Sequence, residues 1–357
     1  MPSCRGILDD PPMKRECPTL PFVKSTYTAA LFLFLALLFL PTESVAQEAL
    51  AAFASPVVGK AKPAFRYQLF AFPSEPVRGQ AATFSSLEQS LFLSVPVWQS
   101  DSDEITFQGS VRGNVIQTEA MMPTTGSPFP KNLTDVRFGP TYRHSFGNGW
   151  VTGINIQAGS ASDKPFAKYD DSEFMASWFL RMPSGGSNAW LFFLNYSNNR
   201  DFANHIPIPG FGYSFGDNKW CRGLLGVPIV ALTLLPKSKL NLSLTYLPLL
   251  NITSELGYDF IPPLRLFTEF KWSSEIYFRN DQPDKKRRLF LVDKRISAGL
   301  RIRPSRWAEI RLSGGWIFDR MSFESRSVYK DRDYNRLDFG AGPFGLFELK
   351  VRMLGKS

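Results

Sequence analysis

The chain is poor in the two side chains that most often bind metals or activate nucleophiles. It holds three cysteines and two histidines among 357 residues. Cys4 and Cys17 fall in a predicted leader described below, so Cys221 is the single thiol of the exported part. A disulfide framework and a cysteine-rich metal site are therefore excluded within one exported chain. With so few histidines to activate it, Cys221 is interpreted as an inert thiol, and we expect no cofactor and no metal site.

The sequence also lacks a long apolar run and any amphipathic helical stretch of ten residues. The run Ala29 to Leu40 covers under about 20 Å as a helix, whereas a bilayer core is about 30 Å thick. It follows Lys24 and precedes small residues at positions 44–46, which is the order of a secretory signal peptide. We predict a signal peptide over residues 1–46, with Met13 as an alternative start. A transmembrane anchor is the weaker alternative.

The rest of the chain divides into a short Ala-rich linker, residues 47–63, and a body, residues 64–357. Throughout the body, apolar and polar residues alternate with a period of two, and turn residues punctuate the pattern. Successive side chains of a strand point to opposite faces, so each such strand has one apolar and one polar face. The clearest example is the segment 288–303, in which an apolar face alternates with a charged one. The body is therefore predicted to be one all-β domain.

Alternation alone does not distinguish a membrane barrel from a soluble β-sandwich. The leader and strands of ten or more residues favour a barrel that crosses a membrane. Aromatic residues near strand ends are typical of the two membrane interfaces. These aromatic residues are Trp98, Trp150, Trp190, Tyr196, Trp220, Tyr246, Tyr258, Trp272 and Trp316. We predict an all-β fold, a single antiparallel transmembrane β-barrel of the bacterial outer membrane, with a soluble periplasmic β protein as the alternative.

The spacing of turn residues predicts about sixteen strands, within a range of twelve to sixteen, joined by short periplasmic turns and longer outer loops. The predicted strands lie near residues 66–72, 88–98, 103–116, 133–144, 149–159, 172–182, 188–197, 206–214, 219–226, 229–235, 239–247, 252–260, 264–278, 288–303, 307–318 and 333–353. Sixteen strands require a tight bend at residues 226–228, and a fold-back there reduces the number to twelve or fourteen. Pro96 and Pro140 fall inside predicted strands, although a closed sheet accepts proline only at bulges or strand ends.

With these features assembled, the chain resembles bacterial outer-membrane β-barrel proteins over nearly all of residues 60–357. The stretch from Ile206–Tyr213 (IPIPGFGY) through Ser254–Tyr258 (SELGY) is similar to a group of such barrels that has no assigned function. The resemblance implies three partners: the lipid bilayer of the outer membrane, surface lipopolysaccharide and the barrel-insertion machinery. The chain departs from many such barrels at residues 353–357, because it does not end on an aromatic residue. The oligomeric state stays open.

The polar face of each strand should line the lumen, because an Arg or Lys that faces lipid at the midplane costs roughly 2 to 4 kcal/mol. The basic residues assigned to this face are Arg112, Arg137, Arg143, Arg265, Lys271, Arg295, Arg301, Arg303, Arg311, Lys350 and Arg352. The acidic ones are Glu255, Asp259, Glu269, Asp293, Glu309 and Glu348. Two interpretations stay open. The excess of positive charge favours an aqueous path for anions, or cross-strand ion pairs fill a closed lumen.

The predicted function is that of a porin-like barrel, a passive path for small anionic solutes. The alternative is a non-conducting structural or surface-binding barrel that uses loops 117–132 and 279–287 for contact. A membrane-embedded lipid hydrolase would need a histidine to activate a serine, but the neighbours His144 and Ser145 point apart on a strand. We therefore predict no enzyme activity. The basic run 284–288 favours a solvated outer loop, and we expect no nucleic-acid partner.

Overall fold

A computed structural model describes residues 55–200, 203–216, 219–236, 238–247, 251–282, 284, 286–328 and 331–352. Within these residues, all seventeen strands belong to one sheet. The strands are β1 Ala64–Pro76, β2 Thr83–Gln99, β3 Asp103–Thr118, β4 Asn132–Ser145, β5 Val151–Ser162, β6 Glu173–Pro183, β7 Ala189–Ser197, β8 Ile208–Phe215, β9 Cys221–Val227, β10 Val230–Leu234, β11 Leu240–Leu247, β12 Asn251–Ile261, β13 Leu264–Tyr277, β14 Arg288–Ser305, β15 Ala308–Ser325, β16 Leu337–Asp338 and β17 Gly342–Arg352. The predicted signal peptide lies outside the described residues.

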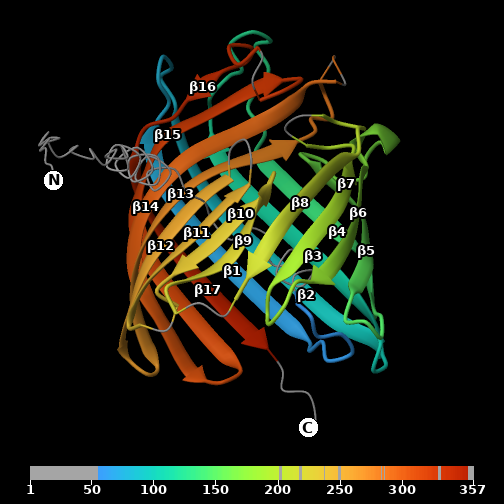
Figure 1. Cartoon of the computed structure of the whole chain (residues 1–357). Coiled ribbons are helices and arrows are strands. Elements are labelled where there is room, and N and C mark those ends of the chain that lie inside the picture. Colours follow the sequence, from blue (N-terminus) through green and yellow to red (C-terminus); the bar gives the residue numbers. More distant parts are fainter. Residues whose placement is uncertain are drawn as a thin grey trace, which may run out of the picture. The chain divides into compact units, whose positions relative to one another are not determined.

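The sheet is a closed antiparallel barrel (Figure 1). Each wall strand pairs with its neighbour in sequence, and β1 pairs with both β2 and β17. The two-residue strand β16 pairs only with the far end of β15, whereas β15 and β17 pair along most of the length of β17. Sixteen strands therefore form the wall, and the predicted all-β barrel is confirmed.

Helical structure is nearly absent from the described chain. The one helical element there is a 3₁₀ turn, η1, at Tyr169–Asp171 in the connection between β5 and β6. In the part of the chain that the structure describes, no helix has the length and apolar character needed to cross a membrane.

Each predicted strand overlaps one wall strand, and the largest differences lie near the C-terminus. The predicted strand 333–353 is β17, which begins only at Gly342. The preceding strand does not end at 318 as predicted, because β15 continues to Ser325. The β14–β15 register shifts between Val292 and Lys294, and pairing then resumes beyond Asp319, which has a positive φ of 47°. Asp319, a polar residue that the sequence pattern placed in a loop, therefore lies at a bulge within a longer strand.

The structure also resolves the two weak points of the strand prediction. The bend at 226–228 is present, because β9 and β10 pair as an antiparallel hairpin with Leu225 opposite Val230. Pro96 lies at a bulge, where the β2–β3 register shifts between Pro96 and Trp98. The β4–β5 register passes from Phe138–Ala158 directly to Thr141–Asn155, so Pro140 lies where the ladder is interrupted. Both prolines thus occupy sites at which a missing donor is tolerated.

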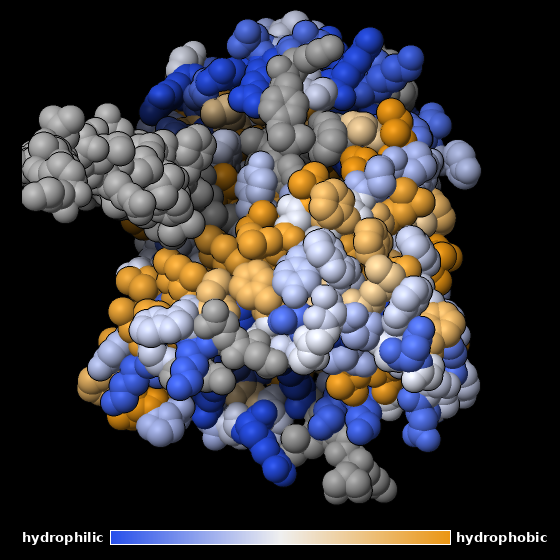
Figure 2. Space-filling model, in the orientation of Figure 1, coloured by the Kyte–Doolittle hydropathy of each residue, from blue (hydrophilic) through white to orange (hydrophobic). Residues whose placement is uncertain are grey.

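Apolar side chains cover the outside of the barrel. On β14, Ile296 is 56% exposed while its neighbours Arg295 and Ser297 are 7% and 6% exposed. The same arrangement of exposed apolar and buried polar side chains recurs around the wall. The large exposed apolar residues include Leu93, Phe107, Phe138, Ile154, Trp178, Leu194, Leu225, Leu256, Leu266 and Leu312. Figure 2 shows the resulting hydrophobic band at mid-height, with hydrophilic residues above and below it. Only hydrocarbon covers such a surface without a large cost, so this is a barrel that spans a membrane.

The two ends of the barrel differ in the length of their connections. One end carries the short connections 100–102, 146–150, 184–188, 216–220, 235–239, 262–263 and 306–307. The other carries the connections 77–82, 119–131, 163–172, 198–207, 228–229, 248–250, 278–287 and 326–341. Membrane barrels have short periplasmic turns and longer extracellular loops, so we name these the inner end and the outer end.

Candidate functional site

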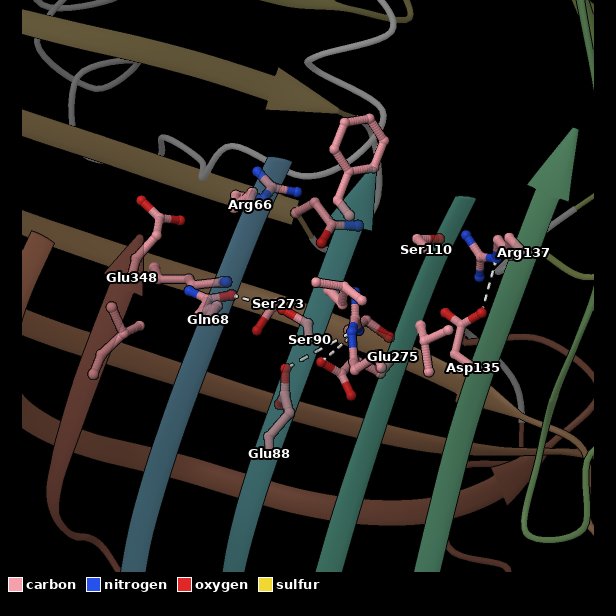
Figure 3. A pocket seen from close by; sticks show the side chains of 18 of the residues that line it. Arg66, Gln68, Glu88, Ser90, Ser110, Asp135, Arg137, Ser273, Glu275 and Glu348 are labelled. Carbon is pink, nitrogen blue, oxygen red and sulfur yellow. Dashed lines mark hydrogen bonds and ion pairs between the residues drawn. The ribbon is translucent and has the colours of Figure 1, made fainter. Parts of the chain in front are cut away.

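Three hollows in the lumen together take in the lumenal residues proposed from the sequence except Asp259 and Asp293, which accept hydrogen bonds from Arg265 and Arg295. A central cavity of about 420 Å³ is lined by strands from both halves of the barrel (Figure 3). It includes Arg112, Arg137, Glu269, Lys271, Arg295, Arg311 and Glu348. An inner vestibule of about 540 Å³ includes Glu255, Arg265, Arg301, Arg303, Glu309, Lys350 and Arg352. A side pocket of about 280 Å³ includes Arg143.

Arg112 bridges the lumen. Its guanidinium lies 2.8 Å from Glu275 on β13 and 3.7 Å from Glu88 on the adjacent strand β2. Five wall strands separate β3 from β13 along the shorter way around the barrel, so this contact is not a cross-strand pair on one face of a ladder. Figure 3 shows Glu88 and Glu275 turned towards the same part of the cavity. The central cavity is therefore crossed by charge rather than open from wall to wall.

A second ionic cluster lies between the central cavity and the inner vestibule. Glu255 on β12 accepts from Arg301 at 2.7 Å and lies 3.2 Å from Arg311. Arg311 also donates to Glu269 at 2.7 Å, and its guanidinium lies 4.0 Å from the centre of the Phe267 ring. Glu269 and Arg311 line the central cavity, whereas Glu255 and Arg301 line the vestibule. The cluster therefore joins the linings of the two hollows.

Charge pairing in the two hollows is one-sided. Each carboxylate that lines them has a basic partner within 4 Å: Glu88, Asp135, Glu255, Glu269, Glu275, Glu309 and Glu348. Within the described residues, the side chains of Lys271 in the cavity and of Arg222, Arg306 and Arg352 in the vestibule have no such partner. Among the described residues of these two hollows, the charge that has no ionic partner is positive.

Several residues of the cavity were missing from the sequence-based set. Glu275 lies on the same face of β13 as Lys271 and could have been found by extending the alternation by four residues. Arg66 and Gln68 on β1 follow the same rule. Nothing in the sequence brings Glu88 to Arg112 and Glu275, because that convergence depends on the curvature of the closed wall.

Apolar residues close the lumen at the outer end. A buried cluster forms there from inward-facing positions of the wall and from the loops 119–131 and 326–341. Its members are Phe70, Phe72, Val77, Phe84, Ile116, Ala120, Met122, Phe129, Leu133, Ala161, Tyr277, Leu289, Leu291, Ile317, Leu337, Phe339 and Phe344. The ring centroids of Phe84 and Phe339 lie 4.1 Å apart, with the ring planes tilted by 35°. We call the described residues of these two loops, with the strap described next, the lid.

The strap is the segment 278–282, which connects the outer end of β13 to the outer end of β5. The backbone N–H of Phe278, directly after β13, donates to the carbonyl of Ala161 on β5 at 2.7 Å. Strands β5 and β13 are eight positions apart in either direction around the wall, and are therefore opposite one another. Asn280 extends the contact, because its N–H donates to Asp163 Oδ1 at 2.8 Å and its carbonyl accepts from Lys168 Nζ at 2.8 Å.

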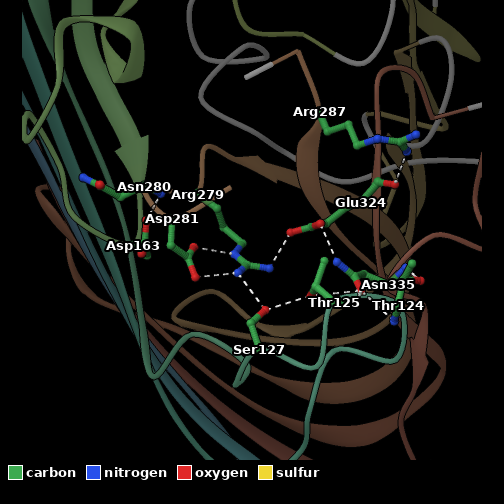
Figure 4. Close-up of polar contacts among 10 residues, drawn as sticks. All are labelled: Thr124, Thr125, Ser127, Asp163, Arg279, Asn280, Asp281, Arg287, Glu324 and Asn335. Carbon is green, nitrogen blue, oxygen red and sulfur yellow. Dashed lines mark hydrogen bonds and ion pairs between the residues drawn. The ribbon is translucent and has the colours of Figure 1, made fainter. Parts of the chain in front are cut away.

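A buried polar network ties the strap to the loops (Figure 4). Arg279 Nη1 donates to Glu324 Oε1 at 2.6 Å, and these two side chains are 3% and 1% exposed. Asn335 Nδ2 donates to the other oxygen of Glu324 at 2.7 Å. Arg279 Nη2 also donates to Ser127 Oγ at 3.1 Å and to Asp281 Oδ2 at 2.8 Å. Burial raises the pKa of Asp281, but the hydrogen bond from Arg279, the positive charge of Arg279 and smaller contributions together outweigh this and hold that pKa below its usual range.

The loops 117–132 and 279–287, which the sequence offered as surface contacts, are thus partly committed to the lid. Loop 119–131 contributes apolar side chains to the lumen, and residues 279–282 belong to the strap. Further along, Arg287 lies against the Tyr334 ring at 4.1 Å, so this part of the basic run also contacts the protein itself.

The described part of the predicted linker, residues 55–63, lies against the inner end of the lumen. Arg143 donates to the carbonyls of Ser55 and Val57 at 2.6 and 3.1 Å, and its charge is balanced by Glu104 at 2.7 Å. Glu104 in turn accepts from the N–H of Gly59 at 2.8 Å. Gly59 has a φ of 76°, and a Cβ there would lie 1.8 Å from the carbonyl oxygen of Ser100. The segment is therefore fixed at a position that only glycine fits.

The histidines are not arranged for nucleophilic catalysis. His144 Nδ1 lies 2.7 Å from Asp103 Oδ1 at the inner end of β3 and β4. In the part of the chain that is described, no hydroxyl or thiol side chain hydrogen-bonds to the ring of His144 or His205. Across the same residues, no group of three or more His, Cys, Asp or Glu side chains is placed to hold a metal ion.

No protein-family model matches the chain, and no curated protein matches it in sequence. Among solved structures, it is similar to OccK7 (OpdD) of Pseudomonas aeruginosa at 9% identity and a TM-score of 0.38, over 82% of this chain and 99% of that one. An outer-membrane channel from Pseudomonas putida F1 shares 9% identity at a TM-score of 0.34, over 83% and 96%. The β domain of the Bordetella autotransporter BrkA shares 8% identity at a TM-score of 0.28, over 81% and 99%. The barrel assignment stands on strand pairing and surface composition, independently of these likenesses.

Proposed function

We propose that this protein is a channel of the bacterial outer membrane that conducts small anionic solutes and whose outer mouth is closed by the lid in the structure. The observation that carries the proposal is the one-sided pairing in the lumen. Every carboxylate of the two hollows is neutralised, while Lys271, Arg222, Arg306 and Arg352 lack partners among the described residues. Fixed positive charge along a water-filled path lowers the energy of an anion and raises that of a cation.

The outer membrane is part of the proposal because of two features of the chain. A closed antiparallel barrel with an even number of strands and an apolar outer band is the form that bacterial outer-membrane proteins take. The predicted signal peptide at residues 1–46 provides the export route. In this setting the barrel-insertion machinery and surface lipopolysaccharide are the expected partners, alongside the lipid bilayer.

Ion selectivity in planar bilayers tests the proposal. With a potassium chloride gradient, the reversal potential of the wild-type protein should correspond to preference for chloride. Lys271→Glu and Arg306→Glu should each shift it towards potassium, because the first reverses a charge in the central cavity and the second a charge at the inner vestibule. The control Arg326→Glu makes the same change of charge on an outer loop, where Arg326 is exposed, and should leave the reversal potential unchanged. Cation preference in the wild type would contradict the proposal.

One observation favours a second candidate, a non-conducting barrel with a structural or binding role. The lid spans the mouth from β5 to β13, and Arg112 crosses the cavity below it. If neither the wild type nor a variant with a weakened lid ever shows conductance steps, this second candidate replaces the first. Neither proposal includes a catalytic step.

A further inference from the structure

Two basic residues lie directly opposite one another in the wall of the central cavity. The register between β13 and β14 pairs Lys271 with Arg295, and both residues line the cavity. Residues at such positions have Cβ atoms about 4.5 to 5.5 Å apart, and like charges there destabilise the sheet. A negative charge close to both cations removes this repulsion.

A second opposed pair shows how this lumen satisfies two such cations. Arg301 and Arg311 lie opposite one another on β14 and β15. One carboxylate oxygen, Glu255 Oε2, lies 2.7 Å from the guanidinium of Arg301 and 3.2 Å from that of Arg311. A single carboxylate from a neighbouring strand therefore bridges two opposed basic residues.

The pair in the central cavity has no carboxylate in the equivalent place. Asp293 accepts hydrogen bonds from Arg295 Nε and Nη2 at 2.8 and 2.7 Å, so it occupies two of the three guanidinium nitrogens. The remaining nitrogen, Nη1, and the ammonium group of Lys271 have no hydrogen-bonding or ionic partner among the residues that the structure describes. Two cationic donors on opposed residues of one cavity are therefore available to a ligand.

The other carboxylates near this pair are held by different basic residues. Glu269, two residues before Lys271 on the same face of β13, accepts from Arg311 at 2.7 Å. Glu88 and Glu275 both contact the guanidinium of Arg112. Because these two carboxylates share one cation, a ligand with a second negative charge would be repelled by them. The arrangement fits an anion with a single charge.

An apolar surface adjoins the basic pair. The guanidinium of Arg295 lies 4.1 Å from the centre of the Phe70 ring, and the centroids of the Phe70 and Phe344 rings are 5.2 Å apart. Phe344 and Leu346 both line the cavity. At about 420 Å³, the space lies within the range of about 300 to 1,000 Å³ that is usual for sites of small ligands. An organic ligand can use both this room and the apolar contact, whereas an inorganic ion cannot.

We propose that Lys271 and Arg295 form a binding site for a small organic monocarboxylate. The ligand carboxylate bridges Lys271 Nζ and Arg295 Nη1, as Glu255 does for the other opposed pair. The apolar body of the ligand lies against Phe344 and Leu346. This rests on the proposed function, because it names a solute class and a binding site within the same basic lumen.

Isothermal titration calorimetry of hexanoate into the full-length protein in detergent tests the proposal. Lys271→Gln should weaken hexanoate binding about tenfold, because it removes one charge-assisted contact. Arg306→Gln removes a positive charge from the inner vestibule instead and should leave the affinity for hexanoate unchanged. Heat-modifiable migration in gels confirms that each variant is folded.

Matched ligands test the charge and the apolar body separately. Hexanamide has the same chain without the negative charge, and adipate carries a second carboxylate at the far end of the chain. Both should bind about tenfold more weakly than hexanoate, or less tightly still. Acetate and inorganic phosphate should also bind more weakly, because they lack the apolar chain. Leu346→Asn should reduce the difference in affinity between hexanoate and acetate.

Three results would overturn the site: no hexanoate binding, binding that is insensitive to Lys271→Gln, or binding that Arg306→Gln weakens equally. Equal affinity for hexanoate and phosphate would also overturn it, because the pair would then bind anions without regard to an organic body. Chloride-selective currents without hexanoate binding would leave the channel in place and reject the site. Binding with the expected sensitivity but without any current would overturn the channel and leave the site in place.

Discussion

The ion pair between Arg279 and Glu324 should control how often the lid opens. The two groups are 2.6 Å apart and almost fully buried, at 3% and 1% exposure. Arg279→Ala would leave the carboxylate with only the Asn335 amide as a close partner. Removal of one partner from a buried pair costs about 3 to 5 kcal/mol, so the population of open lids should rise by roughly two to four orders of magnitude.

Two measurements follow the lid directly. Amide hydrogen exchange of residues 119–131 and 278–282 should accelerate in Arg279→Ala, while exchange in the inner half of the barrel should not change. In planar bilayers the same variant should show more frequent or larger conductance steps. The apolar cluster of seventeen residues remains in place, so the lid should open transiently rather than unfold.

Arg326→Ala is the matched control, because it also removes a guanidinium from a carboxylate in an outer loop. Arg326 and Asp284 lie 2.7 Å apart, but they are 58% and 32% exposed, and exposed pairs contribute little. If the two variants exchange at the same rate, or if Arg279→Ala exchanges like the wild type, the buried pair does not hold the lid and the reasoning fails.

Three further results are expected. Gly59→Ala should make residues 55–63 susceptible to proteolysis, because its Cβ would lie 1.8 Å from the Ser100 carbonyl oxygen. Gly79→Ala is the control: Gly79 has a similar φ of 79° but open space around it, so this variant should not increase proteolysis of residues 55–63. Hydrogen bonding from Arg326 lowers the pKa of Asp284, so this loop contact should persist from neutral pH down to about pH 4 and weaken only at lower pH, as the carboxylate is protonated; loop exchange that already accelerates near pH 6 would contradict this. A closed wall without free edges should keep unheated protein in a form that migrates differently from heated protein in detergent gels; identical migration would contradict it.

The strands of the wall could be predicted because lipid on one side and water on the other impose the same alternation on every strand. Residues 288–303 carry this signal clearly, and their inward and outward positions follow from it. The lumenal charges could be assigned for the same reason, since the outer surface has no place for them. The alternation is a local property of the chain, so it needs no knowledge of which strands are neighbours.

The lid could not be predicted, because its residues break the rule that identified the wall. Phe70, Phe72 and Phe84 face the lumen and are apolar, so an alternation analysis treats them as interruptions. The strap depends on a contact between β5 and β13, which are distant in sequence and come together only when the barrel is closed. Likewise, the approach of Arg112 to Glu275 depends on the diameter of the barrel and not on spacing in the chain.

The pairing of β1 with β17 over eight positions has a consequence for how the protein is assembled. Until the final strand is in place, the incomplete sheet has two edge strands with unpaired backbone amides and carbonyls. Exposure of each such group to hydrocarbon would cost several kcal/mol. Insertion of one hairpin at a time into a lipid bilayer without assistance is therefore unfavourable. The edge strands β1 and β17 must be shielded from lipid until they pair and close the barrel. Assembly of the barrel should therefore depend on a factor that binds both edge strands. A chain truncated before residue 342 lacks β17, so it should be degraded as an incomplete product.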